Sequence, residues 1–162
     1  MMGEYPQVVL FGSIGGGWRE DHIIPVLDEL GVTYFNPVGD EWTKDMGDRE
    51  ADMMAHCETI VIVINTLRPS FTGLAETGWA ALGAAQRGQH LILQIDEDMT
   101  IDFPDSIRHT EDGAEFARLM QHWATSSRYL VLRHARYFDL DRLHLVDDLD
   151  GVAAALRTIY GG

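Results

Sequence analysis

Short apolar runs alternate along the chain with longer segments of helical periodicity. Residues 59–64 (Thr-Ile-Val-Ile-Val-Ile) are apolar without alternation, which is typical of a parallel strand buried on both faces. Residues 8–11 and 89–95 have a similar character, and shorter runs at 32–35 and 143–146 predict two further strands.

The segments between these runs predict helices. We expect helices from Glu20 or Asp21 to Gly31, over 45–58, from Ser70 or Thr72 to near Gly88, from Asp112 or Gly113 onward, and from a cap at Asp150 to Tyr160. In the fourth of these helices, the predicted inner face consists of Phe116, Leu119, Met120 and Trp123. We interpret residues 129–132 (Tyr-Leu-Val-Leu) as a further short strand or an edge.

The alternation of strands and helices predicts an α/β protein with helices on both faces of a parallel sheet. We expect one domain over residues 1–162, with a flavodoxin-like three-layer sandwich and a mainly parallel sheet of about five strands. Apolar residues make up 46% of the chain, which is enough for a full core in a domain of this size.

Loops with chemically useful residues follow the first three strands. A glycine-rich loop begins at Gly12 without the spacing of a dinucleotide-binding loop, so it indicates either close backbone approach to a ligand or mere flexibility. Asn36 opens the loop at 36–42, and the segment 68–76 follows the third strand. Because the carboxyl ends of parallel strands meet at one edge, these loops are expected to form one pocket. Trp18 and Trp42 could each offer a flat face there, although packing is the commoner role of a tryptophan.

Two glutamates near this edge each allow two interpretations. Glu76 could act in chemistry, or it could simply favour the positive end of the helix dipole. Glu50 falls on the apolar stripe of the helix at 45–58, where a carboxylate is unfavourable unless it is paired, protonated or lines a cavity. Alternatively, it lies at the edge of the stripe and meets Arg49 or Arg19.

Charge and composition exclude several classes of function. Acidic residues outnumber basic ones by 26 to 12, so the net charge of −14 repels nucleic-acid phosphates and we expect no nucleic-acid partner. Cys57 is the only cysteine and the seven histidines show no paired ligand spacing, so we assign no metal site and expect no cofactor. The acidic run 96–98 could hold a cation, but such runs are usually solvated. No apolar run approaches the length of a membrane span, which predicts a cytoplasmic protein without a membrane partner.

Several motifs share an order and spacing with one group of enzymes. They are Phe11-Gly-Ser-Ile with Trp18, Phe35-Asn-Pro with Trp42, Glu50 shortly before the central strand, and Ser70 with Glu76-Thr-Gly78. Over roughly residues 8–96, this set resembles the nucleoside 2-deoxyribosyltransferase-like superfamily. That group includes transferases that exchange the bases of 2′-deoxynucleosides and hydrolases that cleave nucleoside 5′-monophosphates.

The resemblance implies a small-molecule nucleoside or nucleotide substrate and a retaining displacement at its anomeric carbon. Glu76 would be the nucleophile that forms a covalent sugar–enzyme ester. Glu50 would handle the base, and we hypothesise that it protonates the departing ring nitrogen with a pKa raised by burial. Trp18 would pack on the base, while Gly12 and Ser13 would line the sugar side.

The departures from the family pattern leave the substrate open. Ser70 stands where the transferases carry an aspartate that holds the sugar hydroxyls, and it is similar to the serine with which the hydrolases grip the 5′-phosphate. Arg68 or Arg19 would assist in holding a phosphate. Asn36 belongs to the implied substrate-binding residues, but the arginines that often follow Asn-Pro in relatives are replaced by Val38-Gly39.

We therefore expect cleavage of the N-glycosidic bond of (deoxy)nucleosides with transfer to another base. The alternative is hydrolysis of (deoxy)nucleoside 5′-monophosphates, and a non-catalytic nucleotide-binding or sensor module is the alternative of another class. Cleavage of an NAD-like dinucleotide by the same chemistry is a further possibility. The resemblance also implies a homo-oligomer, a dimer or larger, in which a neighbour's loop closes the site.

Overall fold

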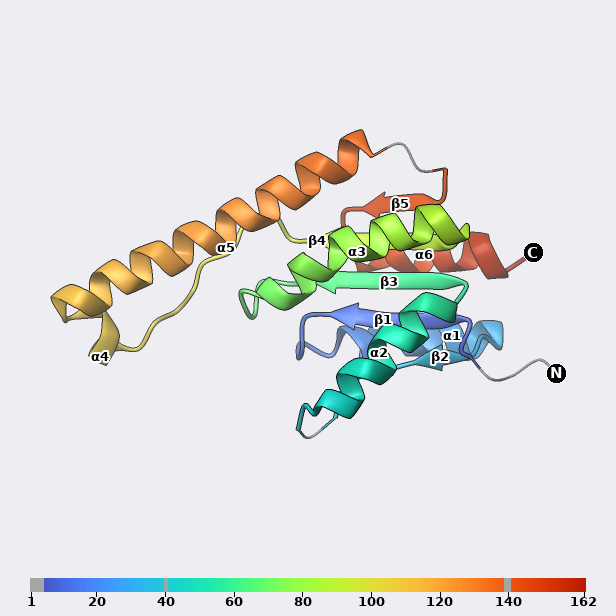
Figure 1. Cartoon of the computed structure of the whole chain (residues 1–162), viewed down its shortest axis with the longest axis horizontal. Helices are drawn as coiled ribbons and strands as arrows, with labels where there is room; N and C mark the ends of the chain where they lie inside the picture. The colour runs from blue at the N-terminus through green and yellow to red at the C-terminus, as the bar shows by residue number, and fades with distance from the viewer. Residues whose placement is uncertain (1–4, 40, 139–140) are drawn as a thin grey trace.

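The computed structural model describes residues 5–39, 41–138 and 141–162 and is built on one five-stranded sheet (Figure 1). Its strands are β1 (Val8–Gly12), β2 (Tyr34–Phe35), β3 (Thr59–Ile64), β4 (His90–Ile95) and β5 (Leu143–Val146). All neighbouring strands are parallel, in the order β2-β1-β3-β4-β5. The predicted flavodoxin-like α/β fold is thus confirmed. Asp40, within the expected loop 36–42, lies outside the described residues.

Helices cover both faces of the sheet (Figure 1). One face packs against the π-helical turn η1 (Trp18–Ile23), α1 (Ile24–Leu30) and α6 (Leu149–Tyr160). The other face packs against α2 (Lys44–His56), α3 (Phe71–Arg87) and α5 (Glu111–Tyr137). Every residue of β3 is buried because this strand lies between β1 and β4 and is covered on both sides. Its unbroken apolar run therefore matches its place in the fold.

Some helix starts differ from the prediction. Helical structure begins at Trp18, before Glu20 or Asp21, and Pro25 lies in the first turn of α1, where its missing N–H does no harm. The cap of α6 is Asp148, whose carboxylate accepts a hydrogen bond of 2.8 Å from the Gly151 N–H. The prediction of Asp150 as this cap is wrong, because two aspartates close together in sequence do not reveal which one precedes the first turn.

Residues 129–132 lie inside α5, so the prediction of a strand or edge there is wrong. Ala124, Arg128 and Leu132 are buried and follow one another at intervals of four, which is the spacing of one helical face. A run of only four apolar residues is compatible with either structure, and the tertiary packing decides. Although α5 is the longest helix, neither it nor any other described helix is both long and apolar enough to cross a bilayer.

The N-terminal half of α5 extends beyond the sheet, together with the short helix α4 (Asp105–Arg108) (Figure 1). Phe116 and Trp123 on this half are 49% and 50% exposed, while Leu119 and Met120 are partly buried. The predicted inner face of this helix therefore does not meet the core at the two aromatic positions. Periodicity identifies an apolar face of a helix, but it does not reveal what covers that face.

Gly12 ends β1 where the backbone of this strand lies closest to β3. Its φ of 116° is unfavourable for other residues, and a Cβ atom there would collide with the carbonyl group of Val63. Gly31, with φ of 66°, offers a comparison because a Cβ atom there would meet open space.

We expect Gly12→Ala to lower the free energy of unfolding by about 3 kcal/mol or more, since two paired strands would have to separate locally. Gly31→Ala should cost only about 1 kcal/mol, because it adds backbone strain without a collision. Urea unfolding of both variants measures the difference. Equal losses would mean that the close approach of β1 and β3 does not constrain Gly12.

Candidate active site

A hydrogen bond between two serine side chains joins the loops that follow β1 and β3. Ser13 Oγ and Ser70 Oγ lie 2.7 Å apart. Ser13 Oγ also accepts a hydrogen bond of 3.0 Å from the backbone N–H of Asn65, and the Ser13 N–H donates to the Val63 carbonyl. Two predicted site residues, Ser13 and Ser70, are thereby held together at the sheet edge where parallel sheets bind ligands.

Ser70 has an unfavourable backbone conformation. Its φ of 56° and ψ of 39° are left-handed, and it is the one non-glycine residue with positive φ in the described part of the chain. Ser70 occupies the N-cap position of α3, but its hydroxyl makes no capping bond and instead donates to the Arg68 carbonyl at 3.2 Å. The expectation that Ser70 or Thr72 caps this helix through its side chain is therefore wrong. Backbone strain of this kind persists only where surrounding contacts maintain it, and it is concentrated at active sites and ligand-binding sites.

Glu76 lies in the second turn of α3 and is partly buried. The helix dipole acts mainly on the first turn, so it gives little reason for an acid at this position. Burial raises the pKa of the Glu76 carboxyl, and the nearby charge of Glu50 raises it further. The two predicted catalytic carboxylates, which are on different helices, are thus close enough to affect each other.

Glu50 is also partly buried on α2, and burial raises its pKa. The two arginines proposed as its alternative partners are occupied elsewhere. Arg49 lies over the ring of Phe35 at 5.1 Å, and Arg19 donates to the carbonyls of Leu10 and Ser13 at 3.2 and 2.8 Å. Among the described residues, Glu50 therefore has no ion pair with an arginine, and its charge acts on Glu76.

Trp18 and Arg19 differ from their predicted roles. Both side chains are 2% exposed, and both donate hydrogen bonds to the Ser13 carbonyl. The Arg19 guanidinium lies 4.0 Å from the centre of the Trp18 ring. A ring and a cation enclosed in this way cannot lie against a base or a phosphate, so these two predictions are not supported. Instead, both side chains hold the loop that presents Ser13.

The remaining predicted residues lie around the same edge. The Asn36 side chain donates to a Glu20 carboxylate oxygen at 3.3 Å and accepts from the Val38 N–H, which fixes the start of its loop. Trp42 is 69% exposed, and the Arg68 side chain is exposed on the loop before α3. The close packing of β1 against β3 is by itself a sufficient reason for a glycine at position 12, whether or not Gly12 also lines a ligand.

Sequence reasoning missed two residues that shape this site, Asn65 and Arg128. The side chain of Asn65 donates to the Gly15 carbonyl at 3.1 Å and accepts from the Leu67 N–H at 3.1 Å, so it links both loops. A polar residue directly after a buried strand was the available signal. Arg128 lies about 60 residues further along the chain, and nothing near it in the sequence reveals that it reaches this edge.

The acidic run 96–98 is not arranged as a cation site. The Asp96 carboxylate accepts a hydrogen bond of 2.7 Å from Gln94, and Glu97 lies 3.8 Å from Arg133. Within residues 5–39, 41–138 and 141–162, no group of three or more histidine, cysteine or acidic side chains could hold a metal ion.

The chain matches no protein-family model, no curated protein and no solved structure. What the site can do must therefore be argued from its own residues. A pair of partly buried carboxyl groups with raised pKa values can divide the roles of nucleophile and proton donor, because their repulsion favours a state with one proton between them.

The mutual effect of the two carboxylates can be measured directly. Glu50→Gln removes the second cause of the shift and leaves the first, burial. The pKa of Glu76 should therefore fall towards, but not reach, the ordinary value of a glutamate. The pH dependence of the Glu76 carboxyl carbon resonance reports this change.

Asp48→Asn, at an exposed position of α2, should leave that titration unchanged.

Because folding raises the pKa of Glu76, its ionisation destabilises the native state, and stability should increase as the pH falls through the folded pKa. A Glu76 titration identical in wild type and Glu50→Gln would show that the carboxylates act independently.

Proposed function

We propose that the protein cleaves the N-glycosidic bond of (deoxy)nucleosides with Glu76 as the nucleophile and transfers the sugar to another base. The observation that carries this proposal is the Glu50–Glu76 pair beside the Ser13–Ser70 hydrogen bond at the carboxyl edge of β1 and β3. Paired carboxyl groups of different protonation perform glycosidic displacement with retention. The proposal also rests on the family resemblance of residues 8–96.

In the first step, a Glu76 carboxylate oxygen attacks C1′ of the sugar. The bond between C1′ and the base nitrogen breaks, its electron pair goes to the base, and the protonated Glu50 supplies a proton to the departing ring. A covalent ester between the sugar and Glu76 remains. In the second step, a ring nitrogen of another base attacks C1′ and gives its proton to the Glu50 carboxylate, while the ester bond breaks and releases Glu76 as a carboxylate. Attack by water instead would give hydrolysis.

The raised pKa of Glu50 suits a proton donor, whereas the charge of Glu50 raises the pKa of Glu76, so the reaction requires the state in which Glu76 is ionised and Glu50 holds the shared proton. Glu50 must hold its proton near neutral pH until the base leaves, and burial favours its protonated form. Glu76 must be ionised, and once it is, its negative charge favours retention of the proton on Glu50. When the ester forms, Glu76 loses its charge. Glu50 therefore becomes ionised without repulsion from Glu76 when it gives its proton to the base.

Ser70 favours the second candidate, hydrolysis of 5′-monophosphates. Its hydroxyl sits beside Ser13 at the start of α3, with the exposed Arg68 two residues earlier. Hydroxyl groups and an arginine at a helix N-terminus are suited to a phosphate group. In a chain of net charge −14, such local donors would be needed to attract a doubly charged substrate.

Incubation with a panel of deoxynucleosides and their 5′-monophosphates, each with and without a second free base, tests the proposal. A new nucleoside that forms only with the second base is the expected result. Glu76→Gln should lower turnover by about a thousandfold or more, because the neutral amide that replaces the carboxylate is not a nucleophile. Glu111→Gln, an exposed glutamate at the start of α5, should leave turnover unchanged.

The other outcomes of this chromatographic assay separate the alternatives. Free base and sugar phosphate from monophosphates alone would replace transfer by hydrolysis. Binding of nucleotides without turnover would favour the sensor module. Release of nicotinamide from an NAD-like dinucleotide, with nucleosides untouched, would point to that substrate instead. Unchanged turnover in Glu76→Gln would remove the mechanism.

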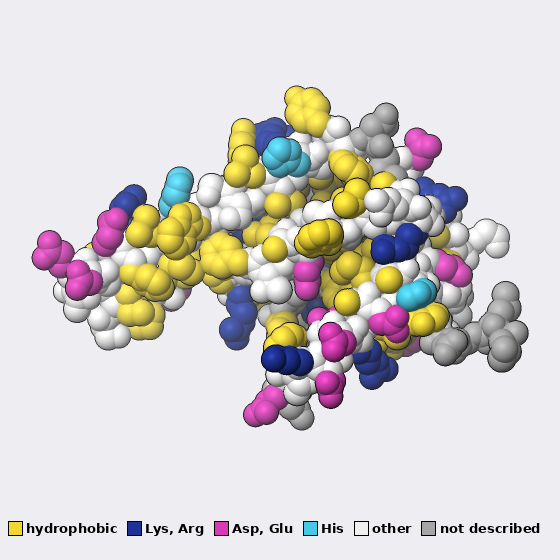
Figure 2. All heavy atoms as spheres, in the orientation of Figure 1, with side chains coloured by type: hydrophobic (Ala, Val, Ile, Leu, Met, Phe, Trp, Pro, Cys, Tyr) yellow, Lys and Arg dark blue, Asp and Glu magenta, His cyan; other side chains and the backbone are white. Residues whose placement is uncertain are grey.

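We further propose that the protein forms a homo-oligomer through α3 and α5. Figure 2 shows hydrophobic side chains gathered over these two helices. On α5, Phe116, Trp123, Leu130 and Tyr137 are exposed at intervals of seven residues, and each is at least 49% accessible. Exposed apolar residues at this spacing form a continuous stripe that suits packing against another helix.

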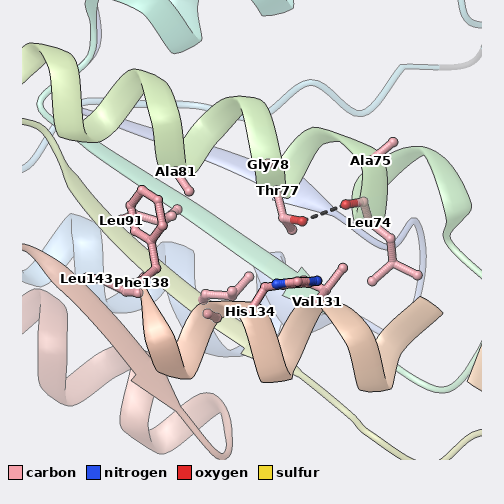
Figure 3. A pocket seen from close by; sticks show the side chains of 12 residues that line it. Leu74, Ala75, Thr77, Gly78, Ala81, Leu91, Val131, His134, Phe138 and Leu143 are labelled. Atoms are coloured by element: carbon pink, nitrogen blue, oxygen red, sulfur yellow. Dashed lines mark hydrogen bonds between the residues drawn. The ribbon is translucent and has the colours of Figure 1, made fainter. Parts of the chain in front are cut away.

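Trp79 and an apolar hollow extend this surface onto α3. Trp79 on α3 is 75% exposed, and an apolar hollow of about 310 Å³ lies between α3 and the C-terminal half of α5 (Figure 3). On the α3 side, the hollow is lined by the small residues Ala75, Gly78 and Ala81. On the other side it is lined by His134 of α5 and by Phe138, which directly follows that helix. A stable interface buries about 800 Å² on each partner, and several large rings at roughly 200 Å² each supply much of that area.

A second copy is the proposed occupant because a two-fold axis would place each copy's stripe against the other's, so that both apolar surfaces are buried at once. We expect Trp79→Glu to shift the protein from dimer to monomer in sedimentation velocity. Trp42→Glu is the control, since Trp42 is 69% exposed but lies on the loop before α2. A wild-type protein that sediments as a monomer at every concentration would contradict the proposal.

A further inference from the structure

Arg128 is completely buried on α5, and its guanidinium donates only to backbone carbonyls among the described residues. One nitrogen donates to Asp96 at 2.9 Å and, more weakly, to Ile64 at 3.5 Å. The other donates to Asn65 at 2.7 Å and to Arg68 at 2.9 Å. The planar fork of an arginine can join carbonyls in two directions in this way, whereas a lysine cannot.

These carbonyls belong to the ends of two adjacent strands and to the loop before α3. Ile64 and Asp96 mark the carboxyl ends of β3 and β4. Asn65 and Arg68 lie on the loop that leads to the strained Ser70. The Arg68 carbonyl accepts from both Arg128 and the Ser70 hydroxyl, so one oxygen connects the buried cation to the serine of the candidate site.

Enclosing this cation is unfavourable. Burial lowers the pKa of Arg128, and the charge of Asp96 opposes that shift only in part. The buried Nε atom has no hydrogen-bond partner among the residues that the structure describes. Apolar residues of similar volume often stabilise a protein as well as buried charges do. A buried arginine that satisfies carbonyls of a loop therefore suggests that the geometry of the loop, rather than overall stability, is what the residue supplies.

We propose that Arg128 is a positioning residue of the candidate active site. One terminal nitrogen of its guanidinium holds the carbonyls of Asn65 and Arg68, while the other is anchored on those of Ile64 and Asp96. The segment 65–68 held in this way sets the left-handed Ser70 against Ser13 and orients the first turns of α3, where Glu76 lies. The catalytic consequence rests on the function proposed above. The consequence for loop order does not depend on that function. The alternative is that Arg128 merely anchors α5 to the sheet.

Arg128→Lys distinguishes the two roles, because it retains the charge and the stem but cannot reach both groups of carbonyls. Hydrogen exchange measured by mass spectrometry should become about tenfold or more faster in the segment 65–70. Strand β3 and helix α5 should remain as protected as in wild type. Arg133→Lys is the matched control on the same helix, since Arg133 is a partly exposed residue near Glu97. It should change neither segment.

Kinetics supply the second readout. If the proposed cleavage occurs, Arg128→Lys should lower kcat about tenfold or more with little change in KM, since Ser70 and Glu76 would be misplaced in the transition state. Faster exchange in 65–70 without any nucleoside turnover in wild type would uphold the positioning of the loop and remove the proposed function. If Arg128→Lys exchanged at the wild-type rate in the segment 65–70, the inference would be overturned. Faster exchange of this variant in α5 alone would also overturn it.

Wild-type protein provides a test that does not require a variant to fold. In exchange at increasing sub-denaturing urea concentrations, the segment 65–68 and the residues of α5 around Arg128 should open together, with the same dependence on urea. If the loop opens independently of α5, Arg128 does not hold it.

Discussion

The close approach of β1 and β3 at their carboxyl ends is the constraint on which the candidate site depends. The backbone of Gly12 lies so near Val63 that no side chain fits between them. This proximity allows Ser13 to bind the Val63 carbonyl, the Asn65 N–H and the Ser70 hydroxyl at once. Because these groups lie at the end of β3, directly after it and at the start of α3, a displacement of one strand end would misplace all of them.

Four buried or partly buried charged side chains surround this arrangement. Glu76 and Glu50 are drawn out of water on neighbouring helices, which raises both pKa values. Arg128 and Arg19 are enclosed below the loops and satisfy carbonyls instead of carboxylates. The two arginines therefore hold the shape of the loops, while the two carboxyl groups keep raised pKa values, as the proposed reaction needs. An arginine beside the carboxylates would have removed that property.

Helix α5 connects two regions of different character. Its buried side carries Arg128 and reaches the loop of Ser70, and its exposed side carries the apolar stripe from Phe116 to Tyr137. A partner that packs on the stripe would thus act on the same rigid helix that orders the site. The acidic surface elsewhere keeps copies apart, so the uncharged stripe is where association is least opposed.

The sequence by itself determined the fold class and the five strands, because each rests on a local signal. The family resemblance selected Glu50 and Glu76 as candidates, and the effect of the Glu50 charge on the pKa of Glu76 came only from the structure. An unbroken apolar run such as 59–64 requires burial on both faces. Only the tertiary structure decided that Trp18 is enclosed, that residues 129–132 continue a helix, and that Arg128 reaches a loop some 60 residues earlier in the chain. These outcomes depend on which surfaces meet in space, and the burial of a side chain is a property of its neighbours rather than of its own chemistry.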